Sequence, residues 1–259
     1  MAIGFKYGVT AACLGYLFAL CLPAYAAPLA AQNTEFIPEN PISENSGPET
    51  EPEKVTTIAT VYATPFDRVW RAILTEAGIP FKTTKVVQGR RRRMFVDGFI
   101  TLDCCFNPSW RNRAEEQVVQ LFTDSFHVTE IRYVFKKGNV IPIPSPEHLK
   151  NLRFAIVRGF TYTLEDYFGE TIAARFPGDA LRLVELGRAQ LTEASRVQFE
   201  FDMAKTPRNL ELGDISSYTN LHARVHISRA DLLPRLNAAI AKLKKNGRIR
   251  EILNASIPN

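Results

Sequence analysis

The pattern of apolar and polar positions changes near residue 55. Up to that point the chain holds one apolar run and then a stretch with almost no apolar periodicity. After it, stretches rich in β-branched residues take turns with stretches that carry an apolar residue every three or four positions, and Gly or Pro separates them. This alternation of strand-like and helix-like segments predicts an α/β fold with a parallel sheet.

The clearest segments open the folded part. Val55–Tyr62 is rich in β-branched residues and predicts a strand. Thr64 and Pro65 predict the cap and first turn of a helix, which Gly78 ends. The predicted elements that follow are a strand over Ile79–Val87, a basic helix ending at Asp97–Gly98, and strands over Phe99–Phe106 and Val128–Phe135.

The second half continues this pattern without an internal repeat. Its predicted elements are a short helix over Pro144–Asn151, a strand over Arg153–Val157, helices over Thr161–Phe168 and Asp179–Leu186, a strand over Ala189–Thr192, a helix over Ser195–Ala204 capped by its serine, and a last strand over Leu221–Ile227. Asp231 is expected to cap a final long helix, which Gly247 ends.

Residues 1–26 have the layout of a secretory signal. A positively charged start precedes an apolar run over Val9–Leu22, and Ala24-Tyr25-Ala26 supplies a small-x-small cleavage pattern. A membrane anchor is the alternative, but crossing a bilayer takes about 20 apolar residues, and Pro23 ends this run. Lipid attachment to a cysteine usually requires a small residue directly before it, and Cys21 follows Leu20. We therefore expect cleavage and a soluble periplasmic product.

Charge is unevenly distributed along the chain. Residues 27–54 hold six glutamates and five prolines, which predicts a disordered acidic tether. Residues 55–259 carry 30 Lys and Arg against 21 Asp and Glu, a net charge of +9. In an exported protein this balance fits an anionic ligand or membrane surface better than nucleic acid, so we predict no nucleic-acid partner. We interpret the basic run Arg90–Arg93 as a solvated helix face.

Cysteine usage leaves two thiols in the exported chain. Cys13 and Cys21 lie in the signal, so only Cys104 and Cys105 remain. Adjacent residues of a strand point to opposite faces, and their spacing is below the usual disulfide range, which predicts two free thiols. No metal-ligand spacing is present, and we predict neither a metal nor a cofactor.

Five segments occur in the order and at the spacing of motifs in one known family. They are Gly98–Phe106 ("G-x-I-D", with Thr101 in place of Asp), Phe122–Phe126 ("F-S-D-P-Y"), Leu149–Gly159 ("L-x-G-x-x-V-G-V-x-x-G"), Leu186–Arg188 ("x-G-R") and the C-terminal stretch Asn237–Ile252. Over about residues 55–257 the chain thus resembles the family 3 extracellular solute-binding proteins, which carry polar amino acids to ABC transporters.

The resemblance implies a type II periplasmic binding protein-like fold, with two α/β lobes joined by a two-strand hinge. The first lobe would comprise residues 55–132 and 222–259, and the second residues 133–221. The strands that cross between the lobes would lie near Tyr133 and near Tyr218–Leu221. Bending at these few residues would close the lobes over a ligand.

The function that the resemblance implies is capture of an amino acid or related small carboxylate by a monomer that serves an ABC permease. One alternative is the same module sensing a ligand for a membrane receptor. Another is an enzyme, because an exported dehydratase is known on this fold. An enzyme of this kind needs a general acid and a general base in the cleft, and the only candidates in the sequence are Glu193 and a distant histidine. We therefore predict a binding protein and not an enzyme.

The anion-binding residue is expected after the third strand. Family members hold the ligand carboxylate there with an arginine, whose planar fork forms two parallel hydrogen bonds. Counting from Ile100-Thr101, Arg113 falls on that position without a gap, and Arg111 is close enough to be the true ligand. The alternative is that both arginines are solvated loop charges.

Other positions of the family's ligand site match less closely. Tyr62 and Trp110 would wall the ligand, although core packing explains Tyr62 equally well. In the second lobe, Phe160-Thr161 matches the family's site at an expected helix start. The free N–H groups there would attract an anion, or the threonine would simply cap the helix. Ser195 falls on the position where the family places an Asp that binds the ligand's amino group. Glu193, two residues before Ser195, could replace that Asp or be a surface charge.

Two departures from the family predict an altered ligand. The hairpin that usually follows the first strand is missing, since the chain runs directly from Tyr62 to Thr64-Pro65. The loop over Asn107–Leu121 is a few residues longer than usual. Both changes fall next to the expected pocket.

Overall fold

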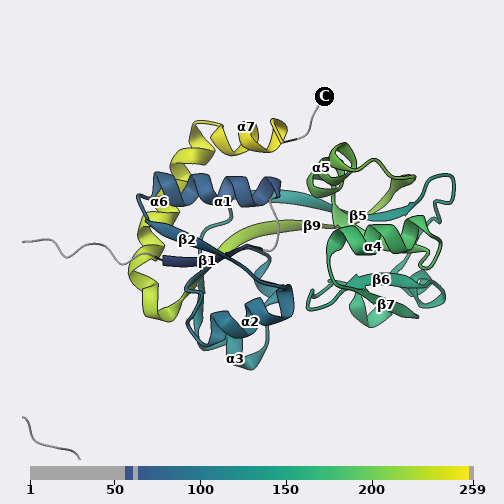
Figure 1. Cartoon of the computed structure of the whole chain (residues 1–259), viewed down its shortest axis with the longest axis horizontal. Helices are drawn as coiled ribbons and strands as arrows, with labels where there is room; N and C mark the ends of the chain where they lie inside the picture. The colour runs from purple at the N-terminus through teal and green to yellow at the C-terminus, as the bar shows by residue number, and fades with distance from the viewer. Residues whose placement is uncertain (1–55, 61–63, 257–259) are drawn as a thin grey trace, which may run out of the picture. The chain divides into compact units, whose positions relative to one another are not determined.

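The computed structural model describes residues 56–60 and 64–256 (Figure 1). The predictions for the signal at 1–26, for the tether at 27–54 and for Tyr62 lie outside the described residues. Within them, no helix is both long and apolar enough to span a bilayer. The predicted α/β architecture is confirmed, because strands and helices alternate as expected along most of the described chain.

The strands of the described residues form one continuous sheet in the order β2-β1-β3-β9-β5-β8-β6-β7, with β4 also paired to β9. Their bounds are β1 Thr56–Thr60, β2 Phe81–Lys85, β3 Leu102–Phe106, β4 Gln120–Phe122, β5 His127–Lys136, β6 Phe154–Val157, β7 Thr171–Ala174, β8 Leu191–Ser195 and β9 Leu210–His226. The pairs β1–β2, β1–β3, β6–β7 and β6–β8 are parallel, whereas β5 and β9 pair antiparallel to their neighbours.

The described helices are short to medium in length. The α-helices are α1 Pro65–Glu76, α2 Gln88–Val96, α3 Ala114–Gln117, α4 Pro177–Glu185, α5 Arg196–Lys205, α6 Leu233–Lys245 and α7 Arg248–Asn254. The 3-10 helices are η1 Pro108–Trp110, η2 Pro146–Asn151, η3 Glu165–Tyr167 and η4 Ile227–Leu232. The cap that Thr64 was expected to supply is present, since its Oγ1 accepts a hydrogen bond of 3.0 Å from the Asp67 amide.

The first half of the sheet is formed by β2, β1, β3 and β4 with the C-terminal part of β9. Helices α1, α6 and α7 pack together over one of its faces, and α2 and α3 lie on the other (Figure 1). Trp70 of α1, Leu102 of β3 and Leu236 of α6 are each at most 1% exposed and belong to one core cluster. This core fixes the carboxyl end of β3, where the candidate site begins.

The second half of the sheet is formed by β5, β8, β6 and β7. Helices α4 and α5 cover one face through a cluster that includes Leu181, Val184 and Phe199. The opposite face is covered by an aromatic cluster in which the ring of Phe154 stacks on that of Phe168, with centroids 3.9 Å apart. The long strands β5 and β9 pair with each other and continue into both halves, and the two predicted crossings fall within them.

Three element predictions are wrong. The segment Thr161–Phe168 is not an α-helix: it holds only η3, because its aromatic residues turn inward and the Tyr162 hydroxyl accepts a 2.7 Å hydrogen bond from the Val157 amide. The last strand begins at Leu210 rather than Leu221, in a stretch without regular strand-like alternation that is held by pairing with β5. Asp231 does not cap α6, because η4 precedes that helix and Leu232 occupies the cap position.

Candidate functional site

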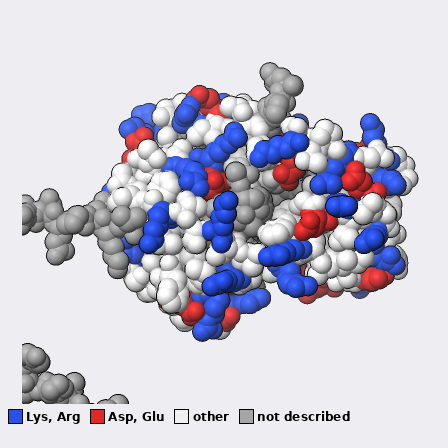
Figure 2. Space-filling view, viewed as in Figure 1, with Lys and Arg blue, Asp and Glu red and all other residues white. Residues whose placement is uncertain are grey.

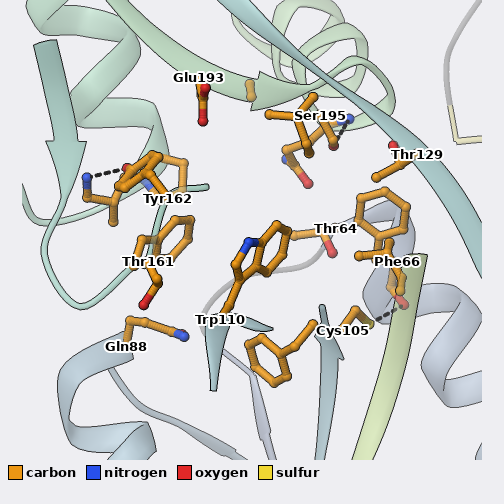
Figure 3. A pocket seen from close by; sticks show the side chains of 18 of the residues that line it. Thr64, Phe66, Gln88, Cys105, Trp110, Thr129, Thr161, Tyr162, Glu193 and Ser195 are labelled. Atoms are coloured by element: carbon orange, nitrogen blue, oxygen red, sulfur yellow. Dashed lines mark hydrogen bonds between the residues drawn. The ribbon is translucent and has the colours of Figure 1, made fainter. Parts of the chain in front are cut away.

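A cavity of about 230 Å³ is lined by residues from both halves of the sheet (Figure 3). One side is formed by the start of α1, by Gln88 and Arg91 of α2, and by the end of β3 with the following loop. The other side comes from β8, the segment after β6 and the helices α4 and α5. Carboxyl ends of strands are where open α/β sheets bind ligands, and β3, β6 and β8 all present theirs here.

A buried network of charges supports the first side of this cavity. Asp103 is fully buried and accepts hydrogen bonds from Arg91 at 2.6 Å and from Arg224 at 2.9 Å. Arg224 also donates to Glu116 at 2.9 Å, and Arg92 lies 3.5 Å from the same carboxylate. Burial alone would raise the pKa of Asp103, but the charges of Arg91, Arg224 and Arg111 hold that pKa below its ordinary value.

Arg111 belongs to this cluster but has no carboxylate of its own. Its side chain is 3% exposed, its guanidinium lies 3.8 Å from the ring centroid of Phe106, and its NH1 donates to the Trp110 carbonyl at 2.9 Å. Its buried Nε has no hydrogen-bond partner, and no ion pair to it is found within residues 56–60 and 64–256. Burial, Arg224 and Arg92 together lower the pKa of Arg111 well below its ordinary value. Asp103 and Glu116 oppose this shift, but neither forms an ion pair with Arg111, which is therefore a buried cation on the cavity wall without an ion pair among the described residues.

Glu193 faces the cavity from β8 on the opposite side (Figure 3). Burial raises the pKa of its carboxyl to about 7, and a hydrogen bond with the Ser216 side chain opposes that rise. In the described part of the chain it has no salt bridge, and the charged groups that shift its pKa include no Arg or Lys. Within the described lining, Arg111 on one side and the acids Glu193 and Asp202 on the other thus have no ion pair.

The other residues predicted for the site divide into those that line the cavity and those that do not. Trp110, Phe160, Thr161 and Ser195 all line it. Arg113 does not: it is exposed at the start of α3 and is absent from the lining. The structure therefore favours Arg111 over Arg113 as the arginine of the site.

Two lining hydroxyls already have partners within the protein. Ser195 caps α5, and its Oγ accepts a 3.2 Å hydrogen bond from the Gln198 amide. Thr161 is not at a helix start; its Oγ1 accepts a 2.8 Å hydrogen bond from Arg92 on the opposite side of the cavity. The expected anion site of helix N–H groups at Phe160-Thr161 is therefore not formed.

The interpretation of Arg90–Arg93 as a solvated face is wrong for its two central residues. Arg91 and Arg92 are 9% and 5% exposed and belong to the buried network, whereas Arg90 and Arg93 are exposed. A sequence signal existed, because Gln88, Arg91, Arg92 and Phe95 recur at helical spacing and all four are buried. On the face in Figure 2 the remaining Lys and Arg are spread over the surface and form no single patch.

The prediction of two free thiols is also wrong. Cys104 and Cys105 are joined to each other by a disulfide, and both line the cavity. The expectation assumed a regular strand with a trans peptide bond, but the bond between them is cis and their Cα atoms are only 3.2 Å apart. Among the described residues no group of three or more His, Cys, Asp or Glu side chains could hold a metal ion.

Alkylation of the denatured, unreduced protein should leave Cys104 and Cys105 unlabelled, because both sulfurs are held in the disulfide. After reduction both should react. Mass spectrometry of the peptide that contains the two residues distinguishes these states, with free Cys added at the same concentration as the reactivity control. Full labelling of both positions without a reductant would contradict the disulfide.

No protein-family model and no curated protein matches this chain. Its fold is similar to that of solved structures. The GluR0 ligand binding core in complex with L-glutamate matches with a TM-score of 0.67 and 14% identity, over 79% of this chain and 99% of that one. AbpA, an amino acid ABC transporter substrate-binding protein from Streptococcus pneumoniae bound to L-arginine, matches with a TM-score of 0.65 and 14% identity, over 80% and 97%.

The BvgS VFT2 domain of Bordetella pertussis is a third such structure, with a TM-score of 0.62 and 14% identity over 78% of this chain and 92% of that domain. These likenesses confirm the predicted fold class: the chain has the mixed α/β fold of type II periplasmic binding proteins. At 14% identity they show the fold alone, so the ligand has to be argued from the cavity.

Proposed function

We propose that this protein is a periplasmic solute-binding protein that captures an amino acid or a related small carboxylate for an ABC importer. The observation that carries the proposal is Arg111, a buried arginine on the cavity wall with no carboxylate of its own among the described residues. A buried charge is costly unless a partner compensates it, and a ligand carboxylate would be that partner.

The chemistry around Arg111 suits a carboxylate. Its guanidinium lies over the Phe106 ring, and its Nε has no partner within the described residues. The indole Nε1 of Trp110 is likewise buried without a partner and belongs to the same wall. Buried donors of this kind on one wall suit a carboxylate, which accepts hydrogen bonds at both of its oxygens. The cavity volume of about 230 Å³, just below the roughly 300 Å³ at which typical small-molecule pockets begin, favours a small ligand.

Capture would involve closure of two lobes about β5 and β9. These strands are the described segments that continue through both halves of the sheet, and the hinge proposed at Tyr133 and Tyr218–Leu221 falls within them. The hydrogen bond from Arg92 to Thr161 joins residues on opposite sides of the cavity. A small change of backbone angles in the two strands would open that contact and admit a ligand.

Export is supported by two features. Residues 1–26 carry the signal-like pattern described above, and the disulfide between Cys104 and Cys105 is of the kind that persists in oxidising compartments such as the periplasm.

Arg111→Met is expected to weaken ligand binding by roughly 30- to 4,000-fold, because truncating one partner of a desolvated charge pair costs roughly 2–5 kcal/mol. Methionine keeps an apolar stem against Phe106 and removes the charge. A thermal-shift panel of amino acids, dicarboxylates and polyamines would first identify a ligand for the wild-type protein, and titration calorimetry would then compare the variants.

Arg113→Met is the matched control, because Arg113 is exposed and lies outside the cavity lining. It should bind as tightly as the wild type. Equal affinity of Arg111→Met and wild type for a carboxylate ligand would exclude Arg111 as the anchor. A wild-type protein that binds nothing in the panel would count against the proposed function itself.

A further inference from the structure

Among the described residues that line the cavity, the charged groups without an ion pair are Arg111 on the first side and Glu193 and Asp202 on the second. On the first side, Arg91 is paired with Asp103 and Asp67 with Arg71, which leaves Arg111 as the unpaired cation of the described lining. On the second side, Glu193 is unpaired. Arg111 follows η1 and Glu193 belongs to β8, so the two groups come from different sides of the lining.

The neighbours of Glu193 on its side of the cavity are acids and hydroxyls, and the basic residues of the described lining, Arg91 and Arg111, belong to the first side. Tyr133 of β5 is its cross-strand neighbour, Ser216 of β9 shares a hydrogen bond with it, and Asp202 of α5 lines the same cavity. The charges of Glu193 and Asp214 add to burial in raising the pKa of Tyr133 to about 12. This end of the cavity is therefore complementary to a cationic group that also donates hydrogen bonds.

Glu193 is also in the right register to take over amine recognition. Residues two apart on a strand share a face, so Glu193 and Ser195 both point into the cavity from β8. The Ser195 hydroxyl is occupied as the cap of α5. A serine is in any case a neutral partner for an ammonium group, whereas an ionised carboxylate forms a charge-assisted hydrogen bond with it.

Between these two ends the lining is mostly apolar. Ile131, Val157 and Leu181 contribute aliphatic surface, and Phe66, Phe106 and Phe160 contribute aromatic surface. Several polar side chains in the wall already have partners, as Thr64, Thr192 and Ser195 do. The buried Thr129 Oγ1 is an exception among the described residues, and it offers a single further hydrogen bond.

We infer that the ligand is a zwitterionic α-amino acid with an apolar aliphatic or aromatic side chain, whose ammonium group is bound by Glu193 and whose side chain packs against the apolar lining. This inference rests on the proposed function and on Arg111 as the carboxylate anchor. It separates this protein from a structural neighbour captured with glutamate, since a second carboxylate would find no unpaired cation in the described lining.

The test uses titration calorimetry at pH 8 on the wild-type protein and on Glu193→Gln. The ligands are leucine and phenylalanine, their des-amino analogues 4-methylpentanoate and 3-phenylpropanoate, and glutamate and arginine. For the wild type we expect an apolar amino acid to bind at least about 30-fold more tightly than its des-amino analogue and than glutamate. For Glu193→Gln we expect that preference over the des-amino analogue to fall by at least about 10-fold, while the analogue itself binds as tightly as before or more so.

Glu200→Gln is the matched control, because Glu200 pairs with Arg196 on α5 and lies outside the cavity lining. It should leave all affinities unchanged. Tighter binding of glutamate or arginine than of leucine and phenylalanine would overturn the inference and leave the proposed function standing. Retention of the full amine preference by Glu193→Gln would exclude Glu193 as its source. Absence of binding by every carboxylate would overturn both.

Discussion

Asp103→Asn is expected to lower the free energy of unfolding by roughly 3–5 kcal/mol, the typical cost of breaking a buried ion pair by removing one partner. Asp103 is fully buried and accepts hydrogen bonds from both Arg91 and Arg224. Asparagine keeps the shape and loses the charge, so the arginines of the network would share Glu116 as their one remaining carboxylate among the described residues. Urea unfolding at pH 7 measures the difference.

Asp97→Asn is the matched control for this prediction. Asp97 pairs with Arg93 on the same helix, but the Arg93 side chain is 77% exposed, and an exposed pair of this kind contributes less than about 1 kcal/mol. The pH dependence gives a second check. Because the pKa of Asp103 is depressed, its contribution is present above pH 4 and is lost only as the pH falls through that lowered value. A loss below about 1 kcal/mol in Asp103→Asn would contradict the role assigned to the network.

The fold could be predicted from the sequence where local signals have a direct physical meaning. The start of α1 could be predicted because a threonine cap and a proline in the first turn stabilise a helix start independently of tertiary contacts. The structure has that cap at Thr64 and Pro65. The prediction of a helix over Thr161–Phe168 is wrong because local sequence signals carry no information about tertiary packing. In that segment the rings of Tyr162 and Phe168 pack on Phe154, and this packing holds an irregular backbone.

The N-terminal half of β9 was missed for a related reason. Leu210–Tyr218 contains Gly213, and its apolar and polar residues do not alternate regularly, so local signals mark it only weakly as a strand. It is extended because most of its residues pair with β5, a partner more than 70 positions away in the sequence, with register shifts that leave out Gly213, Asp214 and Ser216. Long-range pairing of this kind is not visible in a window of ten residues.

Of the residues predicted for the candidate site that the structure describes, all but Arg113 line one cavity. Trp110, Arg111 and Glu193 were named from the sequence and line one cavity. Counting positions nevertheless favoured Arg113, because a gap-free count assumes an ordinary loop, and the 3-10 turn Pro108–Trp110 lies just before Arg111. The disulfide was missed because a geometric rule for regular strands was applied to a peptide bond that is cis.

Glu193→Gln is expected to stabilise the ligand-free protein above pH 7 by up to about 3 kcal/mol. Burial raises the pKa of Glu193 from 4.5 to about 7, so between these two values the folded chain binds a proton that the unfolded chain does not. The free energy of unfolding must then fall as the pH rises through this window, by about 1.4 kcal/mol for each pH unit. Glutamine cannot ionise, so the variant escapes that loss.

The measurement is urea unfolding of both proteins at pH 4.5 and at pH 8, without ligand. At pH 4.5 the two should be nearly equal, because the glutamic acid is then neutral as glutamine always is. At pH 8 the variant should be the more stable. Glu170→Gln, on a side chain that is 63% exposed, is the control and should show no such pH-dependent gain. A Glu193→Gln difference that is the same at both pH values would mean that the carboxyl is not desolvated. If the predicted gain is found together with the loss of amine preference, Glu193 is an acid that the fold keeps at a cost in stability, and an ammonium group of the ligand is what would compensate its charge.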